Sequence, residues 1–186
     1  MIAALYIDPA RGPYASMPDV DAWGIERDAM TYAGPLSVVA HPPCGPWGQL
    51  SWRCSNQDPA CAVRAVEQLR EFGGVLEHPA GSRLWAACNL PRPGEIPRRG
   101  FWSMEVDQVR WGHPCRKRSW LLFCGISPHS IGALPPMRQP THVIDSSRAQ
   151  KRAGVRVRHL PKSRRHLTPP AFARWLVDIA AAHGGT

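Results

Sequence analysis

Reactive side chains adjoin apolar stretches at three places in this sequence. Cys44 comes directly after VVAHPP, Glu77 lies within VLEHP, and Arg116 and Arg118 stand just before SWLLFC. Proteins use thiol, carboxyl and guanidinium groups for nucleophilic attack, proton transfer and stabilisation of negative charge. Each residue also has a structural interpretation: the cysteine as a small buried side chain, the glutamate as a helix cap and the arginines as surface charges.

The prolines before Cys44 indicate how the chain positions it. Pro42 and Pro43 have no N–H to donate to a sheet, so the strand that begins with VVA must end at His41. Cys44 then lies just beyond the carboxyl end of that strand, the edge where open α/β sheets bind ligands. In a mostly parallel sheet, we expect Glu77 and the arginine pair to reach the same edge.

The hydrophobic pattern predicts an α/β fold with a Rossmann-like, mostly parallel sheet. The clearest helix is Asp58–Gly74, with Asp58 as N-cap, Pro59 at the first position and a glycine stop. A final amphipathic helix is predicted over Thr168–Gly185, with Thr168 as its N-cap. The other predicted elements are strands at 2–8, 36–42 and 74–79, a short strand ending at 26, a strand pair at 104–112 and 119–125, and a short helix at 79–88.

The charge distribution suggests a nucleic-acid partner. We expect one domain over residues 1–186, with a basic irregular insertion at about 126–167. The chain carries 23 Lys and Arg against 14 Asp and Glu, a net charge of +9, and residues 148–165 contain no acid. Such a run is typical of contact with a phosphate backbone, although a solvated loop has the same composition. The predicted DNA contacts are Arg156, Arg158, Arg164 and Arg165, with Trp47 as a side chain that could stack on a base or simply pack.

Other sequence features bear on location and metal binding. No apolar run is long enough to span a membrane, and the N-terminus lacks the basic region of a signal peptide. We therefore expect a cytoplasmic protein whose six cysteines are reduced. His41, His78 and His113 each precede a proline near a predicted strand end, but the spacing does not indicate a zinc site.

Four motifs, in this order, resemble those of DNA cytosine-5 methyltransferases. PPCGPW resembles the family's Pro-Pro-Cys-Gln motif, and VLEHP resembles its Glu-Asn-Val strand end. WGHPCRKRSWLLFCG resembles the Tyr-Gly-x-Pro-Gln…Arg-x-Arg strand, and HLTPPAFARWL resembles Leu-Thr-x-x-Glu-x-x-Arg-Leu. The resemblance covers residues 36–125 and 166–180 and implies a reduced methyltransferase-type fold. The chain is also similar to short methyltransferase-like proteins found in phage genomes.

The resemblance implies a mechanism. Cys44 would add to C6 of cytosine and make C5 nucleophilic, and S-adenosylmethionine would supply the methyl group. Glu77, with a pKa raised in a dry site, would protonate N3 or donate a hydrogen bond to it. Arg118, with Arg116, would stabilise the adduct near O2. The target base would be flipped out of a duplex or lie in a single strand.

The chain departs from the family in the region that would bind the cofactor. The residues implied there are Asp8, Gly12, Glu26 and Pro42. The family's glycine-rich loop is reduced to LYIDPARGPY. Cys44 follows Glu26 by only 18 positions, a gap in which the family normally has another strand and helix. The arginine pair also stands one residue closer to the preceding Gln position, which is Cys115 here.

No target-recognition domain is recognisable, and the insertion is too short to replace one, so a partner subunit could supply sequence recognition. The resulting hypothesis is a compact enzyme that modifies cytosine in DNA. Two other classes stay open: a pyrimidine-modifying enzyme with another one-carbon donor or a free nucleotide substrate, and a nucleic-acid-binding protein without catalysis.

Overall fold

The structure, a computed structural model, describes residues 1–48, 51, 57–144 and 158–182. Its strands are β1 (Ile2–Leu5), β2 (Val20–Trp23), β3 (Val38–Ala40), β4 (Gly74–Pro79), β5 (Phe101–Asp107) and β6 (Arg118–Cys124). Its α-helices are α1 (Ala60–Phe72), α2 (Leu84–Ala87), α4 (Lys162–Arg165) and α5 (Pro170–Ala181). Short 3-10 helices are η1 (Pro13–Ser16), η2 (Ala29–Thr31), η3 (Gly45–Trp47), η5 (Gln108–Trp111) and η6 (Pro128–Ile131).

The strands form one six-stranded sheet in the order β2-β1-β3-β4-β6-β5. Strands β2, β1, β3 and β4 are parallel, and β6 is antiparallel to both of its neighbours. The predicted mixed α/β fold with a mostly parallel sheet is therefore confirmed, and its topology is compatible with a Rossmann-like fold. β4 has the predicted bounds: Gly73, at positive φ, ends α1, and Gly74, also at positive φ, is the first residue of β4.

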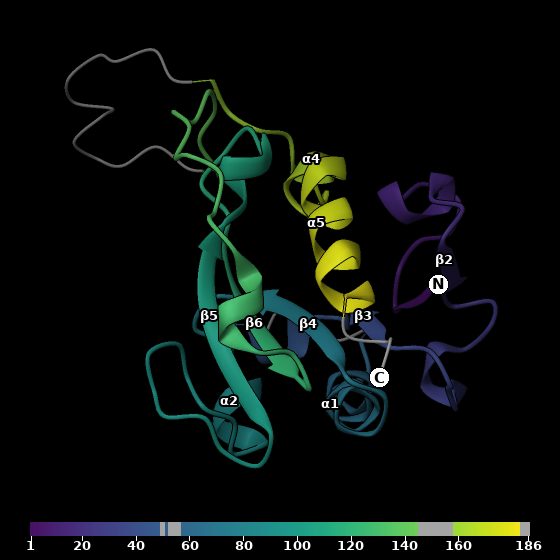
Figure 1. The fold of residues 1–186 in the computed structure, drawn as a ribbon. Coiled ribbons are helices and arrows are strands. Elements are labelled where there is room, and N and C mark those ends of the chain that lie inside the picture. The colour runs from purple at the N-terminus through teal and green to yellow at the C-terminus, as the bar shows by residue number, and fades with distance from the viewer. Residues whose placement is uncertain (49–50, 52–56, 145–157, 183–186) are drawn as a thin grey trace.

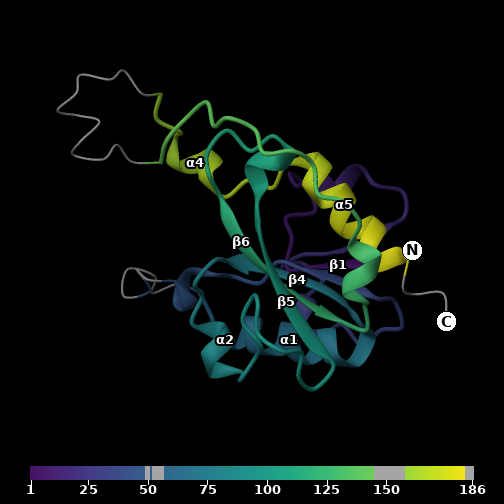
Figure 2. The same cartoon turned by 60° about the vertical axis from the view of Figure 1, so that its left-hand side comes forward.

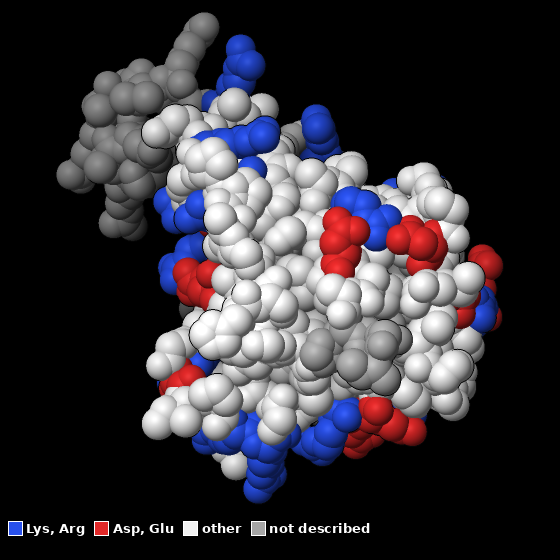
Figure 3. Space-filling view, in the orientation of Figure 1, with Lys and Arg blue, Asp and Glu red and all other residues white. Residues whose placement is uncertain are grey.

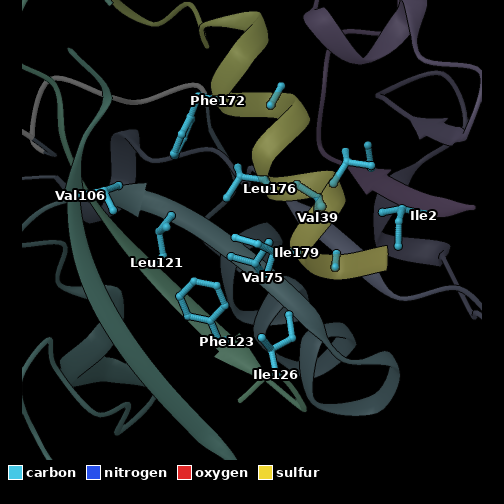
Figure 4. Close-up of a cluster of buried hydrophobic side chains, with 14 of the residues drawn as sticks. Ile2, Val39, Val75, Val106, Leu121, Phe123, Ile126, Phe172, Leu176 and Ile179 are labelled. Carbon is cyan, nitrogen blue, oxygen red and sulfur yellow. The ribbon is translucent and has the colours of Figure 1, made fainter. Parts of the chain in front are cut away.

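Helices cover both faces of the sheet (Figures 1 and 2). α5 packs on one face, and α1 and α2 pack on the other. Figure 4 shows Phe172, Leu176 and Ile179 of α5 directed toward β-strand side chains that include Val39 and Val75. Burial of each such side chain contributes about 1.5–3 kcal/mol, so α5 is fixed firmly above the sheet.

The strand order creates a point of divergence at the carboxyl ends of β1 and β3. Within the sheet, β2 lies on one side of β1. The next strand along the chain, β3, lies on the other side of β1. Loops that leave two such strands in opposite directions open a crevice between them, where α/β proteins bind ligands. Because β6 is antiparallel, its amino end lies at this same edge of the sheet.

Several local expectations are corrected. β3 ends at Ala40 rather than His41, and β2 ends at Trp23, before Glu26. α5 begins at Pro170 with Pro169 at the cap position, so Thr168 is not its N-cap. The insertion includes η6, α4 and a bridge between Val143 and His159, while residues 145–157 lie outside the described part. Among the described residues, no helix has the length and apolar character needed to cross a membrane.

Candidate active site

A cleft of about 1110 Å³ lies at the divergence of β1 and β3. Five segments line it: the loops after β1 and β3, the carboxyl end of β4, the segment before β6 and the stretch from α4 to the start of α5. Of the predicted site residues, the cleft is lined by Asp8, Gly12, Pro42, Cys44, Glu77, Arg164 and Arg165. It is not lined by Glu26, Trp47, Arg116, Arg118 or Arg158, and Arg156 lies outside the described residues.

Cys44 presents an exposed thiol at the start of η3. The turn is closed because the Cys44 carbonyl oxygen accepts a hydrogen bond from the Trp47 N–H at 3.1 Å. Gln57 also holds it, since its Oε1 accepts from the Gly45 N–H at 2.9 Å. Pro42 and Pro43 end β3 and direct the chain into this turn, so the predicted location of Cys44 beyond a strand end is confirmed.

Glu77 is a buried carboxylate, only 9% exposed, near the end of β4. Its Oε1 accepts hydrogen bonds from Gln108 Nε2 at 3.0 Å and from the Ser119 hydroxyl. Burial favours a raised pKa, but the hydrogen bond and charge of His41, the charge of Lys117 and the Ser119 hydroxyl outweigh it. Together they lower the pKa of Glu77 to about 2, so the predicted raised pKa is wrong for this structure.

His41 connects Glu77 to the loop after β1. Its Nδ1 lies 3.2 Å from Glu77 Oε2, and its Nε2 lies 2.6 Å from the Tyr14 hydroxyl oxygen. Tyr14 is 2% exposed, and burial together with the Glu77 charge raises the pKa of its phenol. The sequence pattern did not indicate Tyr14 as a site residue, and it marked His41 only as a histidine that precedes a proline near a strand end.

Of the three neighbouring cations Arg116, Lys117 and Arg118, Lys117 is the one that lines the cleft. Its Nζ donates to the carbonyl oxygens of His166 at 3.1 Å and Leu167 at 3.2 Å. Burial lowers the pKa of its ammonium group, and the charges of Glu77 and Cys44 act in the opposite direction. Lys117 thus interacts electrostatically with both residues, and it ties the start of β6 to the segment before α5.

Arg116 and Arg118 are directed elsewhere, which corrects the expectation that they meet Cys44 and Glu77. Arg118 makes two bonds to Glu105, at 2.6 and 2.9 Å, and Arg116 pairs with Asp107. Successive side chains of a strand point to opposite faces. Ser119 contacts Glu77, so Arg118 next to it faces away.

The loop after β1 only partly matches the expected cofactor site. Asp8 Oδ1 accepts from the N–H groups of Ala10 and Arg11, at 2.9 and 3.2 Å, so the side chain stabilises its own turn. Gly12 is required there, because a Cβ would lie 2.8 Å from the Asp8 carbonyl oxygen. Glu26 is exposed in the turn after β2 and does not reach the cleft.

Two further histidines line the cleft as neutral groups. Burial lowers the pKa of His78 to about 4, and its Nδ1 lies 2.7 Å from the Ser82 hydroxyl. Burial also lowers the pKa of His113. Within the described residues, no three His, Cys, Asp or Glu side chains are grouped so that they could hold a metal ion.

Basic side chains lie at one side of the cleft. Arg164 is exposed, whereas Arg165 donates to the carbonyl oxygens of Leu160 and Ile144, each at 3.0 Å. Figure 3 shows Lys and Arg side chains along the upper left of the molecule, to the left of the place where α4 is labelled in Figure 1. Trp47 packs against the hydrophobic core on the face of the sheet that α1 and α2 cover, and it does not line the cleft.

Comparisons with protein-family models, with curated proteins and with solved structures found no match. The fold and the side chains gathered at the cleft are therefore the basis for a functional proposal.

Proposed function

We propose that this protein activates C5 of cytosine in DNA through a covalent bond between the Cys44 sulfur and C6 of the ring. The observation that carries the proposal is the arrangement of one cleft at the divergence of β1 and β3. An exposed thiol, a buried carboxylate and a half-buried lysine all lie there. Addition of a thiolate to C6 moves electron density to N3 and O2 and makes C5 nucleophilic.

The charge of Glu77 favours cytosine over thymine or uracil. Its low pKa keeps it ionised at neutral pH, so it accepts hydrogen bonds. Cytosine presents an N4 amino donor at the position where thymine presents the O4 acceptor. A carboxylate in the cleft would therefore bind the amino edge of cytosine and repel the corresponding edge of thymine.

Lys117 takes the part that the resemblance implied for the arginine pair. Its ammonium group has three N–H donors, of which two go to the His166 and Leu167 carbonyls. The third is available to the thiolate of Cys44 or to the negative charge that develops on the ring. A positive charge in a partly buried cleft stabilises both more strongly than it would in water.

The resemblance implies that an acid after β2 binds S-adenosylmethionine, but the residues near β2 do not fit that role. Glu26, the acid expected to bind the ribose diol, is outside the cleft. Asp21 within β2 is bound to Trp23 Nε1 at 2.7 Å and to Arg27. We therefore propose the donor by class only, as an electrophilic one-carbon compound that reacts at the activated C5.

A test that needs no donor is exchange of the C5 hydrogen. The Cys44 adduct takes a deuteron from D₂O at C5, and loss of the original proton and of the thiol then leaves 5-deuterated cytosine. DNA would be incubated with the protein in D₂O and digested to nucleosides, and the mass of deoxycytidine would be measured by mass spectrometry. We expect exchange with the native protein and none above background with Cys44→Ser. Equal exchange in the two samples would remove the nucleophile assignment.

The same assay separates the remaining alternatives. Exchange in deoxycytidine monophosphate but not in DNA would identify a free nucleotide as the substrate. Addition of S-adenosylmethionine would convert the exchanging site to 5-methylcytosine only if this cofactor is the donor. Binding of DNA with no exchange would identify a nucleic-acid-binding protein without catalysis.

A further inference from the structure

Two exposed arginines line the cleft. Arg11 lies in the loop after β1, and Arg164 lies in α4. Arginines elsewhere pair with carboxylates, as Arg118 does with Glu105. Within the described residues, by contrast, neither Arg11 nor Arg164 forms an ion pair or donates a side-chain hydrogen bond. We call these two residues the rim arginines, and their guanidinium groups keep all of their N–H donors for another partner.

Of the described Lys and Arg residues at the cleft, the other two have a structural use. Lys117 and Arg165 donate to backbone carbonyl oxygens at 3.0 to 3.2 Å. These bonds fix the segment that contains Arg164, and they occupy donors that an anion would otherwise receive. The rim arginines are therefore the cations of the cleft with every side-chain donor open to an anion.

The two segments that carry the rim arginines are held against each other. Arg174 of α5 donates to both carboxylate oxygens of Asp19, each at 2.8 Å. Tyr14 of η1 and Phe172 of α5 are buried in the same hydrophobic core. Because η1 closely follows one rim arginine and α5 closely follows the other, the backbone at both rim arginines is fixed relative to the cleft.

The position of the rim arginines matches the position of phosphates on a bound strand. Cys44 and Glu77 line the same cleft, and a base that reaches them has its sugar closer to solvent. A nucleotide within a strand carries a phosphate on each side of that sugar. Guanidinium groups bind phosphate through two parallel N–H bonds. We propose, on the basis of the proposed function, that Arg11 and Arg164 each hold one of the two phosphates that flank the target nucleotide.

This phosphate clamp defines the class of substrate. A nucleotide inside a polynucleotide strand offers a phosphate to each rim arginine, whereas deoxycytidine monophosphate offers a phosphate to one of them only. Phosphate contacts fix the position of a strand but do not read its sequence. The clamp therefore holds cytosine with any neighbouring bases.

The trinucleotide dTpdCpdT is the smallest probe for the clamp, because its only phosphates are the two that flank the cytosine nucleotide. Its affinity would be measured at low salt by isothermal titration calorimetry and compared with the affinities of dTpdC and dCpdT, which each lack one phosphate. A hydrogen-bonded contact between charged groups is worth about a factor of ten or more in affinity. We expect each dinucleotide to bind roughly tenfold more weakly than the trinucleotide.

A double-mutant cycle assigns each phosphate to its arginine. Methylphosphonate in place of one phosphate removes the charge and keeps the strand intact. Arg11→Ala should weaken binding of dTpdCpdT roughly tenfold and should no longer respond to neutralisation of one of the two phosphates, while it still responds to the other. Arg164→Ala should show the same pattern with the two phosphates exchanged. Arg92→Ala, at an exposed residue that does not line the cleft, is the control and should respond to both.

Three results would overturn the clamp. These are full response of both variants to both phosphates, coupling of both arginines to the same phosphate, and binding of deoxycytidine monophosphate as tight as that of the trinucleotide. The measurement involves no reaction, so it is independent of the chemistry proposed for Cys44. Exchange at C5 in DNA without this coupling would refute the clamp alone, whereas coupling in a protein that shows no exchange would support the clamp and count against the proposed reaction.

Discussion

Replacement of Glu77 by glutamine tests the energetic role of the buried hydrogen-bond network. The folded protein lowers the pKa of Glu77 from its ordinary value of 4.5 to about 2. Each pKa unit corresponds to about 1.4 kcal/mol, so the ionised form contributes roughly 3 kcal/mol to folding at neutral pH. Because the folded pKa is the lower one, this contribution is present above about pH 4.5 and is lost as the pH falls toward about 2.

Glu77→Gln should therefore reduce the free energy of unfolding by roughly 3 kcal/mol at neutral pH and by much less near pH 2. Urea unfolding followed by tryptophan fluorescence at several pH values measures both quantities. Glu26→Gln, at an exposed acid, is the matched control and should change the free energy by less than about 0.5 kcal/mol. The same loss for Glu77→Gln at neutral and at acid pH would refute the assignment of a stabilising, ionised carboxylate.

Three further predictions follow from the cleft and the sheet. Lys117→Gln should slow C5 exchange about 100-fold, while Arg118→Gln should leave it nearly unchanged, and the reverse order would contradict the placement of the cation. Alanine at the exposed Arg158 and Arg164 should flatten the slope of log K against log salt for DNA binding by about 1 to 2, whereas an unchanged slope would mean that neither contacts phosphate. Gly74→Ala should destabilise the protein by more than about 3 kcal/mol in urea unfolding, because φ is +120° and a Cβ would collide with the β3 backbone; full stability would contradict this geometry.

Local sequence signals were sufficient to predict the elements that carry Cys44 and Glu77. Two prolines follow β3 and end it. A glycine pair stands at the start of β4 and a proline at its end. These strand ends therefore depend on the conformations of single residues. The parallel direction follows from the alternation of strands and helices. Both residues could therefore be placed at one edge of the sheet before the fold was known.

The sequence predicted Arg116 and Arg118 at the cleft, but Lys117 lies there instead, because successive side chains of a strand point to opposite faces. The arginine pair stands one residue closer to the preceding motif than in the family it resembles, and a shift of one residue moves every side chain to the opposite face. Lys117 accordingly interacts with Glu77, and Arg118 turns to Glu105. The shorter spacing was visible in the sequence and could have identified Lys117.

The contact between Tyr14 and His41 had no comparable signal. The two residues are 27 positions apart, and they meet only because the loop after β1 folds back over the end of β3. The same is true of the charge on Glu77, since its pKa depends on His41, Lys117 and Ser119, which belong to other segments. Networks of this kind are set by tertiary packing, which the local pattern does not encode.

The most direct test of the proposed function is covalent capture on Cys44. DNA with pyrimidin-2-one in place of cytosine lacks the 4-amino group, so its C6 is more electrophilic and holds the thiol adduct without any donor. Intact-protein mass spectrometry and peptide mapping should find one adduct, on Cys44, in the native protein and in the control variant Cys88→Ser, and none in Cys44→Ser. DNA binding without an adduct, or an adduct on another cysteine, would contradict the proposal.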